Sequence, residues 1–263
     1  MCMPKLQIND FNMYYQESGQ GEPLFLIPGF SANHHMWDNI VPMLTDKFRV
    51  IQLDNRGSGL SDVPDEFFSI EQMADDIAML AEHLHIKQAF FIGNSMGGAI
   101  VQALAANHPH LTKAIVLSNT FCKTDFRFHL YLEAAYKIQE EKALDTDDFN
   151  KLRLVWPFSE KFVKQNLSDL LELARQDLPF SLDGYQKQYE ALNHFDSSSW
   201  ASKITAPTLI MGGEDDLIVL PKRILALAKC IPHAKVHMFE DVGHLPSLEV
   251  PDVFIDLVRD FFG

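Results

Sequence analysis

The stretch FFIGNSMGGAIV (residues 90–101) places an apolar segment on each side of the small residues GNSMGG. The first segment is typical of a buried strand and the second of a helix. Glycines stand two positions before and two positions after Ser95, which gives the pattern G-x-S-x-G. An ordinary turn also favours Gly, Asn and Ser. The position between a strand and a helix favours a sharp turn that lifts the Ser95 hydroxyl above a sheet.

Similar alternations of apolar runs and amphipathic segments continue on both sides of this turn. Buried strands are expected within residues 24–30, 49–62, 89–94, 113–119, 206–216 and 234–244, and helices over 70–84, 95–107, 221–230 and 251–262. Continuous apolar strands that are each followed by a helix indicate a parallel sheet covered on both faces.

Residues 121–200 break this rhythm, because they lack strand-like runs and carry aromatic and charged residues at helical spacing. The strand pattern on each side looks incomplete alone. The sequence therefore predicts one α/β domain, formed by residues 1–120 and 201–263, with a helical cap inserted at 121–200.

The overall composition excludes several classes of function. The 263 residues carry a net charge of −14 without a block of Lys or Arg, so nucleic acid and anionic membranes are not expected partners. No apolar run approaches the ~20 residues of a membrane span, and the first residues do not resemble a secretory signal. Cys2, Cys122 and Cys230 are too scattered for a disulfide framework or a zinc site. We expect a cytoplasmic protein without metal or cofactor.

Ser95 is the candidate nucleophile. A serine hydroxyl attacks a carbonyl only when an adjacent base removes its proton, and it must be accessible to the substrate. A strand-to-helix turn meets the second need and also directs the free N–H groups of the helix toward the reacting centre. The alternative is a turn without chemical function.

A base and an acid are expected later in the chain, each just beyond a strand. His244 follows a late strand and a glycine, and the alternative for it is an ordinary loop residue. Asp215 and Asp216 both follow the strand within 206–216. Adjacent side chains on an extended loop point in different directions, so only one of the two reaches the imidazole.

Backbone N–H groups are needed to hold the oxyanion of a tetrahedral intermediate. The N–H of Met96, the residue after the nucleophile, is one candidate donor. The second is the N–H of Phe30, in the loop after the strand within 24–30, provided that this strand end lies beside Ser95.

Nearly the whole chain resembles the α/β-hydrolase fold family, through PGFSANHHMWDNIVPML, VIQLDNRGSGLSD, GNSMGGAIVQALAANHP, APTLIMGGEDDLIV and FEDVGHLPSLEVPDVF. The resemblance implies a mostly parallel eight-stranded sheet. It selects Asp216 over Asp215, because the family's acid ends a G-x-x-D stretch before an Ile-Val pair. Where the family commonly has His-Gly, this chain has Pro28-Gly29, which keeps the glycine and the following N–H. Arg56 is expected to anchor its loop rather than bind substrate.

The resemblance points to the branch of small esterases, enzymes similar to 3-oxoadipate enol-lactonase, and carrier-protein methyl ester esterases. The leading interpretation is a serine esterase for small or medium acyl esters or lactones. C–C bond hydrolases and perhydrolases remain open, as does a hydrolase-fold receptor that binds a ligand without catalysis. Residues 121–200 hold 10 Lys and Arg against 14 Asp and Glu, which disfavours docking of an acidic carrier protein. The sequence does not determine the oligomeric state.

The predicted cap is expected to cover an apolar acyl site. Its aromatic residues either line this site or pack the cap onto the body; they are Phe121, Phe126, Phe128, Tyr131, Tyr136, Trp156, Phe158 and Phe162. His34, Trp156 and Leu245 are candidate substrate contacts. Arg153 is a candidate ligand for a substrate carboxylate, and the alternative for it is a surface arginine.

Overall fold

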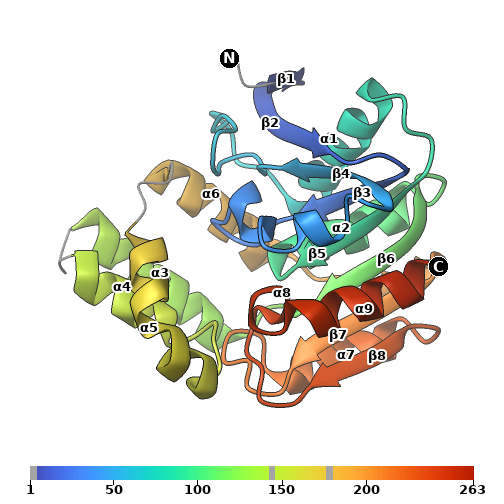
Figure 1. Ribbon diagram of the computed structural model, residues 1–263. Helices are drawn as coiled ribbons and strands as arrows, with labels where there is room; N and C mark the ends of the chain where they lie inside the picture. The colour runs from blue at the N-terminus through green and yellow to red at the C-terminus, as the bar shows by residue number, and fades with distance from the viewer. Residues whose placement is uncertain (1–4, 142–145, 176–179) are drawn as a thin grey trace.

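The computed structural model describes residues 5–141, 146–175 and 180–263. In these residues, eight strands form one sheet in the order β1-β2-β4-β3-β5-β6-β7-β8 (Figure 1). The strands are β1 (Lys5–Ile8), β2 (Phe11–Ser18), β3 (Glu22–Ile27), β4 (Phe48–Leu53), β5 (Ala89–Asn94), β6 (Thr112–Ser118), β7 (Thr208–Gly213) and β8 (Lys235–Phe239). β2 pairs antiparallel with β1 and β4, and the other neighbours are parallel. The expected mostly parallel eight-stranded sheet is confirmed.

Side chains of the central strands alternate between two apolar layers, because successive strand residues point to opposite faces. In β3, Phe25 and Ile27 belong to the layer covered by α1 (Ile70–His83), α2 (Met96–Asn107) and α7 (Pro221–Cys230). Leu24 and Leu26 belong to the opposite layer, which contains Trp37, Leu44 and the apolar side of α9 (Pro251–Phe262). Burial on both faces explains the continuous apolar runs in these strands. Shorter helical elements complete the fold: η1 (His34–Trp37), η2 (Val41–Met43), η3 (Ala201–Lys203) and α8 (Pro246–Glu249).

Helix α1 illustrates how the periodicity predicted the helices. Its buried residues include Ile70, Met73, Ile77 and Leu80, which recur every three or four positions. The side chain of Ser69 accepts a hydrogen bond from the N–H of Gln72, the third helical residue, and the Ser69 N–H donates to the Gln72 side chain. Such a capping box fixes where the helix begins.

The region between β6 and β7 contains α3 (Phe126–Glu140), α4 (Thr146–Leu154), α5 (Glu160–Ala174) and α6 (Leu182–His194). We call α3–α6 and their described connections the helical insertion. Side chains of Asp125, Ser159 and Ser181 cap the first turns of α3, α5 and α6. α3 packs against α6 and α4 against α5, and the group lies at one end of the sheet (Figure 1). The division of the chain into core and cap stays a prediction.

Some features could not be predicted or lie outside the description. β1 and β2 were not predicted, because their residues are more polar than those of the central strands. Cys2 lies outside the described residues, whereas Cys122 and Cys230 are free thiols. None of the helices in the described ranges is long and apolar enough to cross a membrane.

Candidate active site

The residues predicted to carry chemistry lie at one edge of the sheet. Ser95 follows β5, Asp216 lies shortly after β7, and His244 lies in the loop after β8. The carboxyl ends of parallel strands meet at the same edge, which is where α/β sheets bind their ligands. The sheet topology therefore gathers residues that are up to 149 positions apart in the chain.

Ser95 is held in an unusual backbone conformation at the start of α2. Its φ of 55° and ψ of −118° lie in a region that residues with a side chain rarely adopt. The Ser95 N–H donates to Ser118 O at 2.9 Å, and the Thr120 hydroxyl donates to Ser95 O at 2.7 Å. These two bonds hold the turn in place. Ser95 is only 6% exposed.

The two flanking glycines are required by close backbone contacts. A Cβ atom at Gly93 would lie 2.3 Å from Gly97 O, and one at Gly97 would lie 2.2 Å from Ile27 O. Neither position has room for a side chain without a backbone shift. The G-x-S-x-G spacing thus follows from how tightly the chain turns between β5, α2 and the end of β3.

His244 and Asp216 form a buried pair. Asp216 Oδ2 lies 2.7 Å from His244 Nδ1, and the two residues are 1% and 5% exposed, respectively. An ionised carboxylate only accepts, so Nδ1 carries the proton and Nε2 is left as the free acceptor. Ser95 and His244 line the same cavity, although no hydrogen bond joins them in the described part of the chain. Such bonds are often long in the absence of substrate.

Both carboxylate oxygens of Asp216 accept hydrogen bonds. Oδ1 accepts from the N–H groups of Ile218 and Val219 at 2.8 Å each, while Oδ2 also accepts from Asn119 Nδ2 at 2.8 Å. Asp215 instead is exposed to solvent. The sequence analysis missed Asn119. Its signal was its position directly after a predicted strand at the same sheet edge.

The loop after β3 lies against Ser95, as the expected oxyanion site requires. β3 and β5 are neighbours, and a Cβ placed on Gly29 would lie 3.4 Å from Ser95 Cβ. Within the described residues, no hydrogen bond occupies the N–H of Phe30 or of Met96. Two free N–H groups flanking the serine are the arrangement that binds an oxyanion.

The helical insertion holds this loop through Gln188 of α6. Gln188 Oε1 accepts from the N–H of Ser31 at 2.8 Å, and its Nε2 donates to Arg56 O at 2.8 Å. Gln188 is fully buried, and Ser31 has a φ of 54°, in the left-handed region. The amide thus fixes a strained residue directly after Phe30. No sequence signal distinguished Gln188 from other helical polar residues.

A second connection joins the insertion to the loop of His244. Glu249 accepts from the N–H and hydroxyl of Ser159 and from the N–H of Gly243 at 2.9 Å. The His244 N–H donates to Pro157 O at 2.7 Å. Burial raises the pKa of Glu249, and these hydrogen bonds oppose the rise. The imidazole is therefore positioned by segments on both sides of the cavity.

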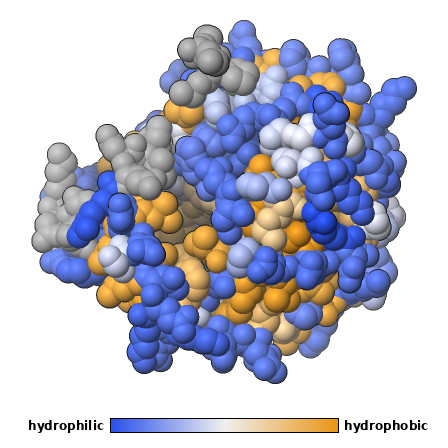
Figure 2. Space-filling view, viewed as in Figure 1, coloured by the Kyte–Doolittle hydropathy of each residue, from blue (hydrophilic) through white to orange (hydrophobic). Residues whose placement is uncertain are grey.

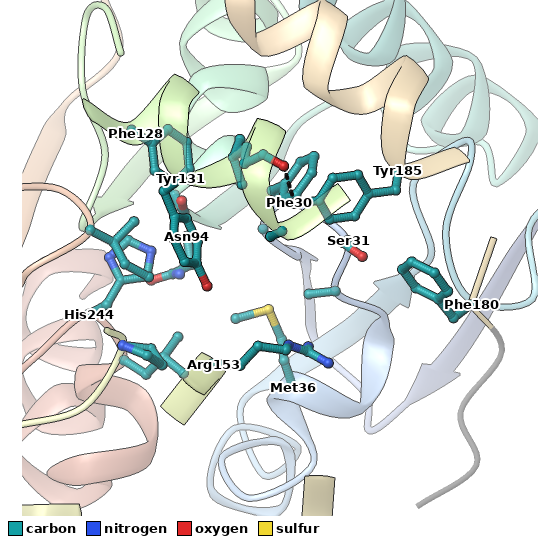
Figure 3. Close-up of a pocket in the computed structure, with 18 of the residues that line it drawn as sticks. Phe30, Ser31, Met36, Asn94, Phe128, Tyr131, Arg153, Phe180, Tyr185 and His244 are labelled. Carbon is teal, nitrogen blue, oxygen red and sulfur yellow. Dashed lines mark hydrogen bonds between the residues drawn. The ribbon is translucent and has the colours of Figure 1, made fainter. Parts of the chain in front are cut away.

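Ser95 and His244 open onto a cavity of about 260 Å³ between the insertion and the sheet edge. Figure 2 shows the surface hollowed in this region, with hydrophobic residues around the hollow. Aromatic side chains from the insertion form much of the wall, among them Phe128, Tyr131 and Tyr185 (Figure 3). The apolar wall suits an acyl chain, and the polar groups are concentrated at few points.

Two of the four predicted substrate contacts, Arg153 and Leu245, line this cavity. Trp156 lines an adjoining cavity of about 150 Å³ instead. His34 lines neither one: it is 3% exposed, and its Nδ1 lies 2.8 Å from Asp54 Oδ1. The imidazole of His34 therefore supports the loop behind the site.

The predicted cap aromatics divide between lining and packing. Phe128 and Tyr131 line the cavity, whereas Phe121 belongs to the main core and Phe158 to a small core within the insertion. Phe126 is 74% exposed. Spacing along a helix identified these residues as apolar surface but did not indicate which of them faces the cavity.

Arg56, expected to anchor its loop, is buried and makes two hydrogen bonds of 2.6 Å with the Asp76 carboxylate. Its guanidinium also lies over the rings of Phe11 and Phe68. Among the described residues, no group of three or more His, Cys, Asp or Glu is arranged to hold a metal ion.

The chain is similar to known proteins over nearly its whole length. Residues 22–251 match the family model for the alpha/beta hydrolase fold. Pyrrolizixenacetamide deacetylase of Xenorhabdus hominickii is 28% identical over 98% of this chain and 97% of its own. The 3-oxoadipate enol-lactonase 2 of Acinetobacter baylyi is 28% identical over 95% and 92%. The crystal structure of the enol-lactonase from Burkholderia xenovorans LB400 superimposes with a TM-score of 0.86, at 25% identity, over 98% and 99% of the two chains.

The family model spans most of the chain, and the mostly parallel eight-stranded sheet is the one that the resemblance implied. The named relatives include a deacetylase and enol-lactonases. On these grounds, the chain belongs to the alpha/beta hydrolase fold family.

Proposed function

We propose that the protein is a serine hydrolase that cleaves carboxylic esters of small to medium acyl groups through an acyl-enzyme. One observation carries this proposal: the buried Asp216–His244 pair lies at the wall of the same cavity onto which Ser95 opens. A serine, an imidazole and an orienting carboxylate are the groups that acyl transfer needs.

In the first half of the reaction, Ser95 Oγ attacks the ester carbonyl and passes its proton to His244 Nε2. Asp216 holds the Nδ1–H tautomer and stabilises the imidazolium that forms. The N–H groups of Phe30 and Met96 bind the oxyanion. The C–O bond then breaks, and the alcohol leaves with the proton from His244.

In the second half, a water molecule gives a proton to His244 and attacks the acyl-enzyme carbonyl. The same two N–H groups bind the second oxyanion. Collapse of this intermediate breaks the bond to Ser95 Oγ, which recovers its proton from His244, and the carboxylic acid is released.

Lactone hydrolysis is the second candidate, because relatives that match nearly the whole chain are named enol-lactonases. A lactone is a cyclic ester, so the same residues would act, with the leaving alcohol still attached to the acyl group. C–C bond cleavage, perhydrolysis, a carrier-protein methyl ester and a non-catalytic receptor stay predictions that no further observation favours.

The test is hydrolysis of p-nitrophenyl butyrate by the wild type and by Ser95→Ala. We expect the variant to lose roughly 1,000-fold or more in kcat, and a fluorophosphonate probe to label only protein that retains Ser95. Ser197→Ala is the control, because Ser197 is also fully buried but does not line the cavity. Undiminished activity of Ser95→Ala would refute the proposal. Tight ligand binding without turnover would favour the receptor.

A further inference from the structure

Arg153 brings a positive charge to the wall of the cavity. It lies in α4, and Figure 3 shows its side chain in the open part of the cavity, with the guanidinium directed away from His244. The carbon of its guanidinium lies 5.7 Å from the centre of the Phe149 ring. Within the described ranges, no carboxylate forms an ion pair with it. A guanidinium that faces a cavity without an internal partner is available to a ligand.

The rest of the cavity wall is electrostatically suited to an anion. None of the described residues that line it is an Asp or Glu, although the chain as a whole has a net charge of −14. The other polar side chains there include Ser31, Tyr131 and Gln139, which carry no charge. Arg153 itself is exposed to solvent, so its charge acts on a ligand group that binds beside it rather than across the whole cavity.

The charge of Arg153 also affects the pKa of Tyr131 and of Tyr185. Burial raises the pKa of both phenols, and the charge of Arg153 acts against that rise. The Tyr185 hydroxyl donates to Leu132 O at 3.2 Å, as the dashed line in Figure 3 marks. Both phenols thus remain neutral, and neither offers Arg153 an internal anion.

We infer that the cavity selects esters, lactones included, that carry a free carboxylate besides the scissile bond, and that Arg153 binds this carboxylate. The inference rests on the proposed function and adds its substrate class. Arginine binds a carboxylate through two parallel N–H donors, which fixes direction as well as charge. The apolar wall would hold the chain between the carboxylate and the carbonyl that Ser95 attacks.

Matched pairs of esters test this inference. Monoethyl glutarate and ethyl pentanoate have five-carbon acyl groups that end in a carboxylate or a methyl group. The pair 4-acetoxybutanoate and butyl acetate places the same difference on the alcohol side. We expect the wild type to favour the anionic member of at least one pair by about 10-fold or more in kcat/KM. The pair that shows the preference tells which side of the ester faces Arg153.

Variants of α4 assign the preference to one side chain. Arg153→Met should lower kcat/KM for the preferred anionic ester by about 10- to 100-fold, mainly through KM, and leave the neutral ester within about 3-fold. Arg153→Lys should retain part of the preference, because the charge remains but the paired donors are lost. Lys151→Met is the control: it removes a positive charge from the same helix at a residue that does not line the cavity.

Failure of this inference is distinguishable from failure of the proposed function. The inference is overturned if the wild type shows no anionic preference, or if Arg153→Met affects both members of a pair equally, while Ser95-dependent hydrolysis of the neutral esters persists. Loss of the proposed function would instead appear as hydrolysis of every ester independently of Ser95, or as no hydrolysis and no fluorophosphonate labelling.

Discussion

Asp215 and Asp216 are adjacent carboxylates with different surroundings. Asp216 is 1% exposed and accepts hydrogen bonds from a side chain and two backbone N–H groups besides its contact with His244, whereas Asp215 faces solvent. Three donors besides the imidazole hold the carboxylate of Asp216 in one orientation. The proposal that Asp216 rather than Asp215 orients the imidazole rests on this difference.

The first prediction concerns this pair. Asp216→Asn should lower kcat on p-nitrophenyl butyrate by roughly 10,000-fold, because an amide in this place allows the imidazole to adopt the wrong tautomer. Asp215→Asn makes the same chemical change one residue earlier, and we expect it to stay within about 3-fold of the wild type. Steady-state kinetics measures kcat for both variants. Similar losses of kcat in the two would contradict the choice of Asp216 over Asp215.

These two residues also show what a sequence can and cannot predict. Strand patterns placed both aspartates beyond the right strand, and physical reasoning required that only one reach His244. Choosing between them needed the family pattern, because the direction of a loop side chain depends on φ and ψ. Asn119 and Gln188 depend on contacts across 97 and 157 positions. The predicted strand locates Asn119 at the sheet edge but does not give its partner, and no local signal marks Gln188.

At the scale of elements, α6 is fastened to the loops around Ser95. Gln188 bonds the Ser31 N–H and the Arg56 carbonyl, and Gly184 packs directly against Gly57. A helix of the insertion thus holds the loop that follows β3. Two predictions distinguish the effect of the Gln188 hydrogen bonds from that of the close packing at Gly184.

The second prediction is that Gln188→Leu lowers kcat by about 10- to 100-fold with a smaller change in KM. Without the amide, Ser31 loses its partner and the N–H of Phe30 shifts from its place beside Ser95, which weakens oxyanion binding in the transition state. Gln102→Leu is a matched control, because Gln102 is fully buried and bonds the carbonyls of Gly98 and Phe121. Equal losses of kcat in the two variants would indicate general damage rather than positioning.

The third prediction concerns Gly184. A Cβ there would lie 2.1 Å from Gly57 O, so Gly184→Ala must push α6 away from the loop. Alanine normally stabilises a helix relative to glycine by about 1 kcal/mol, but here we expect a loss of about 1–3 kcal/mol from overpacking. Urea denaturation measures the free energy of unfolding. A stabilised Gly184→Ala would show that the contact relaxes without cost.

The helices themselves were the easiest elements to predict, and their mutual packing the hardest. Apolar spacing located α1 and α9 nearly to the residue, because each packs one face on the sheet. The insertion helices bury less, and α4 has no comparable apolar stripe. Its place over the cavity, and with it the position of Arg153, depends on packing against α5 and could not be predicted from spacing.

At the scale of the whole molecule, two of the connections between the helical insertion and the rest of the described chain lie at the candidate site. Gln188 forms one of them, beside Phe30 and Ser31. Glu249 forms the other, where it accepts from Ser159 in the insertion and from Gly243 in the loop of His244. The carboxylate of Glu249 is half-buried, so its charge is costly unless these donors are in place.

The last prediction follows from the raised pKa of Glu249, which burial causes and the negative charge of Asp215 reinforces. Because the folded state binds this proton more tightly than the unfolded chain does, its contribution to stability is fully present below the ordinary value of 4.5. That contribution is lost as the pH rises through the folded-state pKa. The free energy of unfolding of the wild type should therefore fall, relative to Glu249→Gln, as the pH rises above 4.5.

Urea denaturation of both proteins between about pH 4 and pH 7 measures the difference between their free energies of unfolding. Groups that titrate alike in the two proteins contribute equally to both values and so do not affect the difference. Glu240→Gln is the control, because it removes an exposed carboxylate from the neighbouring loop. The prediction fails if the difference between wild type and Glu249→Gln is constant over this range or changes in the opposite direction. A falling difference would show that burial of the ionised Glu249 carboxylate costs more than its hydrogen bonds to Ser159 and Gly243 offset.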